Sequence, residues 1–459
     1  MAGGLPAFAK TWSIKTWAIS NAGALRMLKP GLNGDHRHGS LLLDDDPNET
    51  SRERRHPLQP HLLYIGGEDH HLRIPAMCAL RDQGFRITAV ASGDPAPFAQ
   101  AGIRYRDFQF NRFVNPWADL AAIKSLAKIL IEERPDLAQS FDTKPSIFLP
   151  LAARSAPDVL AIRTINGRAF LYSSRSPLAL TLRPVYRALH KLAARTAAAT
   201  VFEISDDRAF FERHGIAGKM PVLIRGAGVD VEGFDRALSS GPSPAQLRHE
   251  LGLGDAEVVM TVTRMTRQKG IPALLDAAAR VHEVRPNVRF VLVGPRESEG
   301  PLAVTQAEID RHAPYVKAIG SRSDIPALLR LANVFAFPTE YREGVPRVLL
   351  EAALAGLPIV TTTMPGCAEV IRDGWNGLLV PPGAPPVLAA KILHLLGNRE
   401  KGLTMANRAA EYVRREFSLA TVVDRHASLY RELIGRARHS RFQNGRFGST
   451  TEDATCGVL

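Results

Sequence analysis

The sequence predicts an α/β protein with two doubly wound, Rossmann-like domains. Short apolar runs of strand length alternate with amphipathic segments of helix length from about residue 60 onward. Polar, glycine-containing loops follow several of these runs, at the carboxyl ends of strands where parallel sheets bind their ligands. A chain of 459 residues is long enough to form two such domains, each with its own core.

The composition points to an anionic partner. The chain is 45% hydrophobic and 23% charged, as in an ordinary globular protein, and its net charge is +12. That charge favours a nucleic acid, a membrane surface or a phosphorylated substrate as partner. The basic residues lie on separate predicted elements without interleaved aromatic residues, so we expect no nucleic-acid partner.

Cysteine usage and hydropathy indicate where the protein works. Cys78, Cys367 and Cys456 are widely separated and form neither a metal-binding nor a disulfide pattern, which suits a reducing cytosol. No apolar run reaches membrane-spanning length, and no signal peptide is evident. We therefore expect a cytoplasmic protein that contacts a bilayer, if at all, from the surface of its inner face.

Changes in composition divide the chain into segments. They are a poorly ordered extension (1–58), a first domain (59–228), a linker (229–255), a second domain (256–420), a helix returning toward the first domain (421–437) and a basic, disordered tail (438–459). The extension has no sustained period, although Trp12 and Trp17 leave an interfacial anchor open. A D-x-D sequence at Asp44–Asp46 lies upstream of the first strand, and we expect no metal there.

The first domain begins with a strand, a glycine turn and a helix. Gly66 and Gly67 let a ligand approach the backbone, and His70 and His71 follow them. We predict strands at 61–65, 86–90, 137–139, 159–163, 200–203 and 221–224, and helices at 72–82, at 116–133, after residue 145 and from residue 206. The polar loop TINGR (164–168) follows one of these strands and contains Asn166 and Arg168.

An amphipathic helix is predicted between residues 178 and 196. Its apolar face consists of Leu178, Leu182, Val185, Tyr186, Leu189 and Leu192, and its basic stripe consists of Arg183, Arg187, Lys191 and Arg195. Like charges at this spacing repel one another unless an anionic surface relieves the repulsion. The pattern indicates either a membrane-surface helix or a solvated charged face.

The second domain opens with a strand (257–263), the basic loop RMTRQKG and a helix (271–284). Arg264 and Lys269 lie in this loop, where both can reach one diphosphate, the arginine as a fork and the lysine as a point charge. A solvated basic loop is the alternative. Later strands are predicted at 288–293, which ends at Gly294, and at 316–319, and three helices fill the region from residue 384 to about residue 436.

The stretch from residue 333 to residue 383 organises the second domain. A buried strand (334–337) leads into a polar loop, and Pro346 suits the first turn of a helix that Gly356 terminates. A second buried strand (358–362), a short helix and a turn-rich segment (373–382) follow.

Two acids flank the start of that helix. The N-terminus attracts an anion such as a phosphate, whereas Glu343 and Glu351 can accept hydrogen bonds from hydroxyl groups. A ligand that carries a sugar, a ribose and phosphates satisfies both preferences. A solvated helix start with an acid favoured by the helix dipole is the alternative.

The segments RMTRQKG, YREGVPRVLLEA and GLPIV…PGCAEVIRDGWNGLLVPP together resemble family-4 glycosyltransferases. The resemblance covers roughly residues 60–436, and its motifs are specific jointly rather than singly. It implies the GT-B fold, in which two Rossmann-like domains face each other across a cleft, the second holding a nucleotide sugar and the first an acceptor. YREGVPRVLLEA is most similar to bacterial enzymes that extend lipid-linked sugars for capsule, exopolysaccharide or O-antigen.

The resemblance assigns roles to the candidate residues. For the donor it implies that Arg264 and Lys269 clasp the diphosphate, that Glu343 meets the sugar hydroxyls and Glu351 the ribose, and that Gly294, Gly344 and Val345 complete the site. For the acceptor it implies contacts with Gly66, Gly67, His70, His71 and Arg168. Many relatives carry a histidine where this chain has Asn166, which stays a catalytic candidate with Glu343, Arg264 and Lys269. The acceptor-side base is therefore left open among His70, His71, Asp142, Arg168 and the leaving phosphate.

The implied reaction is metal-independent, retaining transfer of a hexose-type sugar from a nucleotide sugar, UDP by default, to a lipid-linked saccharide, without a bound cofactor. Negative charge develops on the leaving diphosphate, so we expect Arg264→Ala or Lys269→Ala to lower the rate by a factor on the order of 10²–10³ with folding intact. The alternatives are another GT-B enzyme, such as a nucleotide-sugar epimerase, and a non-catalytic partner subunit that binds the nucleotide sugar.

Overall fold

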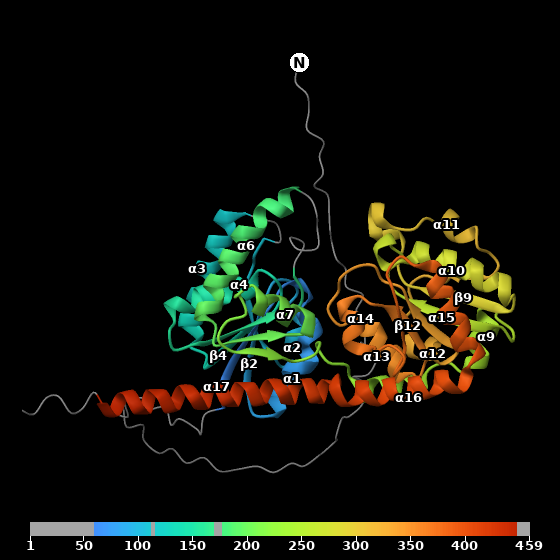
Figure 1. The fold of residues 1–459 in the computed structure, drawn as a ribbon. Coiled ribbons are helices and arrows are strands. Elements are labelled where there is room, and N and C mark those ends of the chain that lie inside the picture. Colours follow the sequence, from blue (N-terminus) through green and yellow to red (C-terminus); the bar gives the residue numbers. More distant parts are fainter. Residues whose placement is uncertain (1–58, 112–114, 169–176, 448–459) are drawn as a thin grey trace, which may run out of the picture. The chain divides into compact units, whose positions relative to one another are not determined.

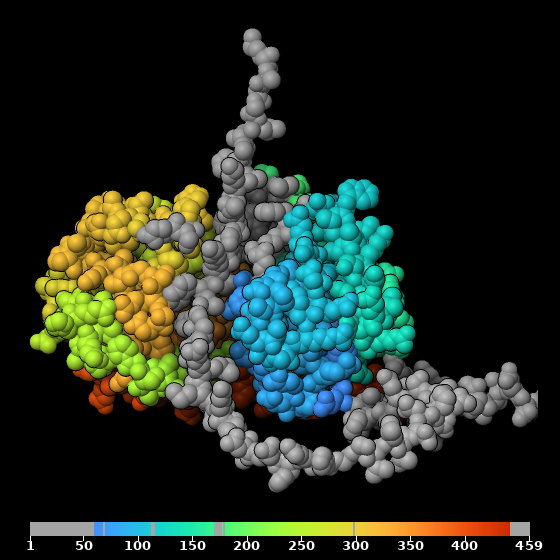
Figure 2. Space-filling view, turned by 180° about the vertical axis from the view of Figure 1, so that it is seen from behind, coloured from blue at the N-terminus to red at the C-terminus, as the bar shows by residue number. Residues whose placement is uncertain are grey.

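The computed structural model describes residues 59–111, 115–168 and 177–447 (Figure 1). The described residues from Pro60 onward form one compact unit. Within it lie two parallel sheets. We call each sheet, together with the helices that pack on it, a lobe, and number the lobes first and second in chain order. The predictions for residues 1–58, including the D-x-D sequence and the interfacial anchor, lie outside the described residues. Figure 2 shows the opposite face, with residues of the first lobe in blue and teal and residues of the second in yellow-green to orange.

The first lobe is a seven-stranded parallel sheet in the order β3-β2-β1-β4-β5-β6-β7. Its strands are β1 (His61–Ile65), β2 (Arg86–Ala91), β3 (Arg104–Asp107), β4 (Leu137–Ser140), β5 (Leu160–Ile165), β6 (Ala199–Phe202) and β7 (Pro221–Leu223). Its helices are η1 (Glu68–Arg73), α1 (Ile74–Asp82), α2 (Ala96–Gln100), α3 (Pro116–Glu133), α4 (Pro145–Ala152), η2 (Ala153–Ser155), α6 (Pro177–Thr196) and α7 (Ser205–Arg213). The strand order reverses between β1 and β4, which makes that point the topological switch point of the sheet.

The second lobe is a six-stranded parallel sheet in the order β10-β9-β8-β11-β12-β13. Its strands are β8 (Glu257–Val262), β9 (Val288–Val293), β10 (Val316–Ala318), β11 (Val334–Phe337), β12 (Ile359–Thr362) and β13 (Leu378–Val380). Its helices include η3 (Arg267–Lys269), α10 (Ile271–Val284), η4 (Glu297–Leu302), α11 (Gln306–Asp310), α12 (Ile325–Arg330), α13 (Arg347–Leu354), α14 (Pro365–Val370), α15 (Pro385–Gly397) and α16 (Arg399–Glu416). Its switch point lies between β8 and β11.

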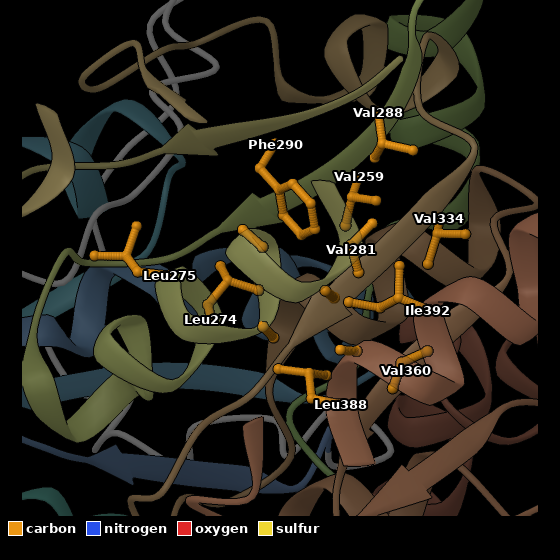
Figure 3. Packing of buried hydrophobic residues seen from close by; sticks show 14 of the residues in the cluster. Val259, Leu274, Leu275, Val281, Val288, Phe290, Val334, Val360, Leu388 and Ile392 are labelled. Carbon is orange, nitrogen blue, oxygen red and sulfur yellow. The ribbon is translucent and has the colours of Figure 1, made fainter. Parts of the chain in front are cut away.

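Each lobe has its own apolar core, because parallel strands are buried on both faces. In the second lobe Val259, Phe290 and Val334 from the sheet pack against Leu274 of α10 and Ile392 of α15 (Figure 3). The predicted α/β class with two doubly wound sheets is therefore confirmed.

Several element predictions need correction. The segment 229–255 is not a plain linker, because it contains α8 (Val231–Ser240) and α9 (Pro244–Glu250). Asp230 caps α8, and Ser243 forms a capping box with Gln246 at α9, so each helix has a local start signal. The segment also belongs to the second lobe, since Arg330 of α12 donates to the carbonyl of Leu238.

Other elements differ in extent. Strand β3 was not predicted, because three of the four residues in its edge sequence RYRD are charged, and β13 lies inside the segment expected to be turns. The helix predicted at 72–82 begins as the 3₁₀ helix η1, and Pro346 precedes α13 as its N-cap instead of lying in its first turn. Gly356 has the left-handed φ of +71° expected of a helix stop.

The last helix, α17 (Leu419–Phe447), is longer than expected. Residues 438–447, which were predicted to be disordered, continue it. Its apolar residues, among them Val422, Ala427 and Tyr430, belong to the core of the first lobe, and the Tyr64 and Tyr430 hydroxyls lie 3.2 Å apart. The helix that begins beside the second lobe thus completes the core of the first.

Helix α6 buries only part of the predicted apolar face. Tyr186 and Ala193 pack into the first-lobe core, whereas Val185 and Leu189 are exposed beside Arg187. Among the described residues, no helix is both long and apolar enough to cross a membrane.

Candidate active site

The main candidate site lies at the switch point of the second sheet. The loop after β8 carries Arg264 and Lys269, and the loop after β11 carries Glu343. β8 and β11 are paired neighbours, with Met260 opposite Phe335, so their following loops leave the sheet side by side. A parallel sheet binds its ligands at this kind of position.

Lys269 and Glu343 form the central ion pair of this site. Lys269 Nζ lies 2.6 Å from Glu343 Oε1, and the Lys269 side chain is only 9% exposed. The Thr339 hydroxyl donates to the same carboxylate oxygen at 2.9 Å. A buried pair of this kind costs desolvation energy, which makes it more typical of a functional site than of a stabilising surface contact.

Arg264 is held by a different acid. Its Nη1 donates to Glu299 Oε2 of η4 at 2.9 Å. A Cβ on Gly294 would lie 1.9 Å from the carbonyl oxygen of Thr263, so the end of β9 must be glycine to pack against the start of this loop. That close packing explains why a glycine is needed at position 294 even without a ligand. Arg264 and Lys269, the two predicted cations, lie on one loop as expected.

Two more glycines permit close backbone packing around Glu343. A Cβ on Gly270 would lie 1.9 Å from the carbonyl oxygen of Pro338, and one on Gly366 would lie 1.8 Å from that of Gly344. The loops after β8, β11 and β12 are therefore packed backbone against backbone. Val345 packs its side chain against Gly226 of the segment after β7.

Glu351 is almost completely buried on the inner face of α13. Arg347, one turn earlier, donates from Nε to Glu351 Oε1 at 3.2 Å. Burial raises the pKa of Glu351 above its usual value, against the opposing effect of Arg347. A carboxyl group shielded from water in this way can accept a hydrogen bond from a hydroxyl group or, when protonated, donate one to it.

The second candidate site lies at the switch point of the first sheet. Asp142, directly after β4, has an unusual left-handed φ of +71°. It accepts hydrogen bonds from the backbone N–H of Gly67 at 3.0 Å and from the Asn166 amide at 3.4 Å. Asp142 thereby joins the glycine turn to the TINGR loop.

The predicted histidines differ in accessibility. The His70 ring is 2% exposed, lies against Gly66 and has its Nε2 3.0 Å from the carbonyl oxygen of Tyr64. Burial, assisted by Arg73, lowers the pKa of His70 to about 3, so the ring is neutral. This environment favours a packing role over the predicted acceptor contact. His71 is half-buried.

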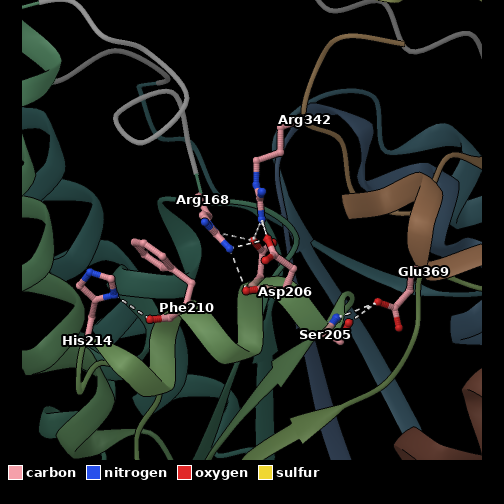
Figure 4. A network of polar contacts seen from close by, with 8 residues as sticks. Arg168, Ser205, Asp206, Phe210, His214, Arg342 and Glu369 are labelled. Carbon is pink, nitrogen blue, oxygen red and sulfur yellow. Dashed lines mark hydrogen bonds and ion pairs between the residues drawn. The ribbon is translucent and has the colours of Figure 1, made fainter. Parts of the chain in front are cut away.

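Arg168 is engaged in a network that the sequence did not reveal. Its Nε donates to Asp207 Oδ1 at 3.0 Å and its Nη2 contacts Asp206, both in the first turn of α7 (Figure 4). Arg342, from the loop of Glu343, contacts Asp206 and donates to Asp207 Oδ1 at 2.7 Å. The predicted acceptor contact of Arg168 is thus occupied by ion pairs.

A second contact begins at the same turn of α7. The backbone N–H and hydroxyl of Ser205 donate to Glu369 Oε2 of α14 at 2.9 and 2.7 Å, and Arg225 donates to Glu369 Oε1 at 2.6 Å. Figure 4 shows Glu369 directed at Ser205 and Arg342 directed at Asp206. The start of α7 therefore meets two separate segments of the second lobe.

Glu203, after β6, was also missed. It is buried, and burial raises its pKa, against the opposing effect of Arg73, whose Nη2 lies 3.9 Å from the carboxylate. A Cβ on Gly344 would lie 3.5 Å from Glu203 Oε2 and 3.6 Å from the carbonyl oxygen of Asn166. The structure therefore brings Asn166 and Glu203 next to the loop of Glu343. An acid at the last position of the strand predicted at 200–203 was the signal in the sequence.

The basic stripe of α6 lies away from these sites. Arg187, Lys191 and Arg195 are exposed and Arg183 is half-buried. Lys191 and Arg195 also line a surface cavity of about 650 Å³ together with Lys219. Among the described residues, no group of three or more His, Cys, Asp or Glu side chains could hold a metal ion.

Comparison with known proteins identifies both lobes. Residues 76–227 match the profile of the glycosyl transferase 4-like domain, and residues 256–398 match that of glycosyl transferases group 1. The chain is 26% identical over 376 residues to the N,N'-diacetylbacillosaminyl-diphospho-undecaprenol alpha-1,3-N-acetylgalactosaminyltransferase of Campylobacter jejuni, covering 81% of this chain and 98% of the relative. It is 28% identical to the UDP-Gal:alpha-D-GlcNAc-diphosphoundecaprenol alpha-1,3-galactosyltransferase of Escherichia coli, over 57% of this chain and 66% of the relative.

Solved structures support the same fold. Anabaena HepE in complex with UDP-glucose aligns with a TM-score of 0.65 at 22% identity, covering 81% of this chain and 99% of HepE. A likeness at this identity establishes architecture alone. Since the two matched profiles fall on the two lobes and the fold is that of GT-B enzymes, the chain belongs to the group 1, family-4-like glycosyltransferases.

Proposed function

We propose that this glycosyltransferase moves a hexose-type sugar from a UDP-sugar to a lipid-linked saccharide, with retention at the anomeric carbon. The observation that carries the donor side is the buried pair of Lys269 and Glu343 at the switch point of the second sheet. A cation and a carboxylate on adjacent loops suit a ligand that carries phosphate beside sugar hydroxyl groups.

The substrate classes come from the relatives. The two relatives described above are named for transfer to undecaprenyl-diphosphate-linked saccharides, and HepE was solved with UDP-glucose. Their common feature, a sugar on a lipid diphosphate as acceptor, is the class we propose for this chain in the synthesis of a bacterial surface polysaccharide.

In the proposed reaction an acceptor hydroxyl oxygen forms a bond to the anomeric carbon while the bond from that carbon to the UDP oxygen breaks. The hydroxyl proton passes to the leaving phosphate, so UDP and the elongated saccharide are the products. Lys269 and Arg264 meet the negative charge that develops on the diphosphate. Glu343 orients the donor sugar, and Glu351 the ribose, by accepting hydrogen bonds from hydroxyl groups.

The acceptor hydroxyl enters from the first lobe in this proposal. Asn166 and Glu203 lie next to Gly344, and Asp142 positions Asn166 from the opposite side. An amide cannot remove a proton, and in this proposal the leaving phosphate takes it. Gly66 and Gly67 stay candidate backbone contacts for the acceptor, because Asp142 fixes their turn.

The test is an assay of the full-length chain with UDP-hexoses and a synthetic saccharide on a short-chain lipid diphosphate. We expect UDP release that depends on the acceptor, together with a product heavier by one hexose in mass spectrometry. Glu343→Gln is the matched control, and we expect it to lose most of this activity. Conversion of the donor without an acceptor would favour an epimerase, and donor binding without any conversion would favour a binding subunit.

We also propose that α6 rests on an anionic membrane surface. Its exposed side carries Val185 and Leu189 beside Arg187, Lys191 and Arg195, a mixture typical of interfacial helices. Helix α3, which packs on α4 as α6 does, exposes Trp117 on its outer side. Co-sedimentation with phosphatidylglycerol vesicles should be stronger than with phosphatidylcholine vesicles, and Arg187→Glu with Lys191→Glu should abolish the difference. Equal binding to both vesicles would show instead that α6 is a solvated face.

A further inference from the structure

The loop that carries Glu343 has little structure of its own. Residues 338–346 form neither helix nor strand, so side-chain contacts fix their path. Within the second lobe the loop is held by the hydrogen bond from Glu340 N–H to the carbonyl of Gln268, at 3.0 Å, and by Thr339. Arg342 of this loop donates a side-chain hydrogen bond to the first lobe, at Asp207.

The partners of Arg342 form a compact, electrically balanced group. Asp206 and Asp207 are shared between Arg342 and Arg168, which gives two acids and two arginines. The Asp207 side chain is fully buried and that of Arg342 is 21% exposed. Because a partly buried arginine bound to two carboxylates has little freedom, its backbone is held at a defined distance from α7.

We propose that Arg342 is a positioning residue, which the carboxylates of Asp206 and Asp207 hold in place so that the neighbouring Glu343 is presented to Lys269 and to the donor sugar. The first lobe would thereby set the geometry of a donor-binding side chain in the second lobe. Arg168 belongs to the same group, and its positive charge neutralises the second carboxylate. This inference rests on the proposed role of Glu343 in the reaction.

The structure supplies a matched control for the alternative that Arg342 only holds the two lobes together. Glu369 also joins the second lobe to the first turn of α7, through Ser205 and Arg225, but it lies on α14 and not on the loop of Glu343. If Arg342 only attached the lobes to each other, loss of either contact should have a similar effect. If Arg342 positions Glu343, only its own loss should impair turnover.

The experiment compares Arg342→Ala, Arg342→Lys and Glu369→Gln in the acceptor-dependent assay, with thermal melting of each variant. We expect Arg342→Ala to lower kcat by about 10-fold to 100-fold, because a displaced catalytic group costs that much. Arg342→Lys should recover part of the loss, since lysine keeps the charge but its amino group lies one bond nearer the backbone than the Nη2 that contacts both carboxylates. Glu369→Gln should stay within about 2-fold of the wild type, because a glutamine still accepts from Ser205.

A double mutant tests whether Arg342 acts through Glu343. In a background of Glu343→Gln, the change Arg342→Ala should cause no further loss, because the side chain it positions is already altered. Additive losses, wild-type kcat in Arg342→Ala, or an equal loss in Glu369→Gln would each overturn the inference. Wild-type turnover in Glu343→Gln would instead remove the proposed function on which the inference rests. If Arg342→Ala melts too early to assay, the same comparison is made with Arg342→Lys, where unchanged kcat overturns the inference.

Discussion

The switch points of the two sheets use charge differently. In the second lobe, Lys269 and Arg264 each meet a carboxylate, so the site holds cations that an anionic ligand can share. In the first lobe, Asp142 accepts from the Gly67 backbone and from the Asn166 amide, so neutral groups hold the acid there. Geometrically equivalent positions in two doubly wound sheets thus hold acids with different partners, cations in the second lobe and neutral groups in the first, which fits the proposed donor and acceptor sides.

This difference suits a reaction in which one lobe binds the leaving group and the other lobe binds the nucleophile. The lobe with paired cations is suited to the group on which negative charge develops, and the other lobe is suited to orienting a neutral nucleophile. Variants in the second lobe should therefore act mainly on turnover, and those in the first mainly on use of the acceptor.

Lys269→Ala should have the largest effect. We expect turnover to fall by a factor on the order of 10²–10³ because a preorganised cation is lost. The sequence alone predicts intact folding, but Lys269 is buried against Glu343, so its loss also leaves a poorly paired carboxylate and lowers the melting temperature. Lys269→Met combined with Glu343→Gln should restore the melting temperature and not the activity. Wild-type turnover in Lys269→Ala would falsify its proposed role.

Arg264→Ala should cause a comparable loss of turnover, on the order of 10²–10³, without the loss of stability. The Arg264 side chain is 33% exposed, so its removal should change the free energy of unfolding by only about 0.5 kcal/mol. Steady-state kinetics and thermal melting of the same preparation check both parts. A large drop in melting temperature would mean that the pair with Glu299 is structural.

Asn166→Ala should have a smaller effect, roughly 10-fold, expressed mainly in the KM for the acceptor. The amide is neutral and its bond to Asp142, at 3.4 Å, is long, so it orients the acceptor without transferring a proton. General acid–base groups typically contribute a factor of about 10²–10⁴. A loss in that range, confined to kcat, would show that this position takes part in proton transfer after all.

Mildly acidic pH should destabilise the first lobe more than the second. Burial, the largest cause in each case, lowers the pKa of His61 to about 4 and those of His70 and His426 to about 3, and all three lie in the first-lobe core or on α17 against it. In the unfolded chain such groups titrate near about 6.5. Between about pH 6.5 and pH 4.5 the unfolded state therefore binds protons that the folded state refuses, and stability is lost as the pH falls.

The second lobe should respond less in the same window, although burial also lowers the pKa of its His312. Its carboxyl groups with lowered pKa values, such as Glu308 at about 2, act only below the unfolded pKa near about 4.5. Glu203 and Glu351, with raised pKa values, act in the opposite direction, one in each lobe. Hydrogen exchange corrected for intrinsic rates should show first-lobe strands losing protection before second-lobe strands. Simultaneous loss in both lobes would mean that they unfold as one unit.

The loops that carry the donor-side candidates could be predicted because their signals are local, whereas the donor-binding roles of these residues stay predictions. Arg264, Lys269 and Glu343 each sit on a strand–loop–helix segment whose apolar run, glycine and proline mark its boundaries. The order of strands in a parallel sheet then brings these loops together. The helices of the segment 229–255 were missed although they carry caps, because glycine and proline suggested a linker.

The amino-acid sequence by itself determined the two sheets, the loops that leave their carboxyl ends, and the residue types placed on those loops. The tertiary structure alone decided which charges meet. Arg342 and Asp207 are 135 residues apart, and Ser205 and Glu369 are 164 apart. A periodic pattern records which face of an element is buried, but the partner of a charged side chain depends on how separate elements pack, and no local pattern contains that information.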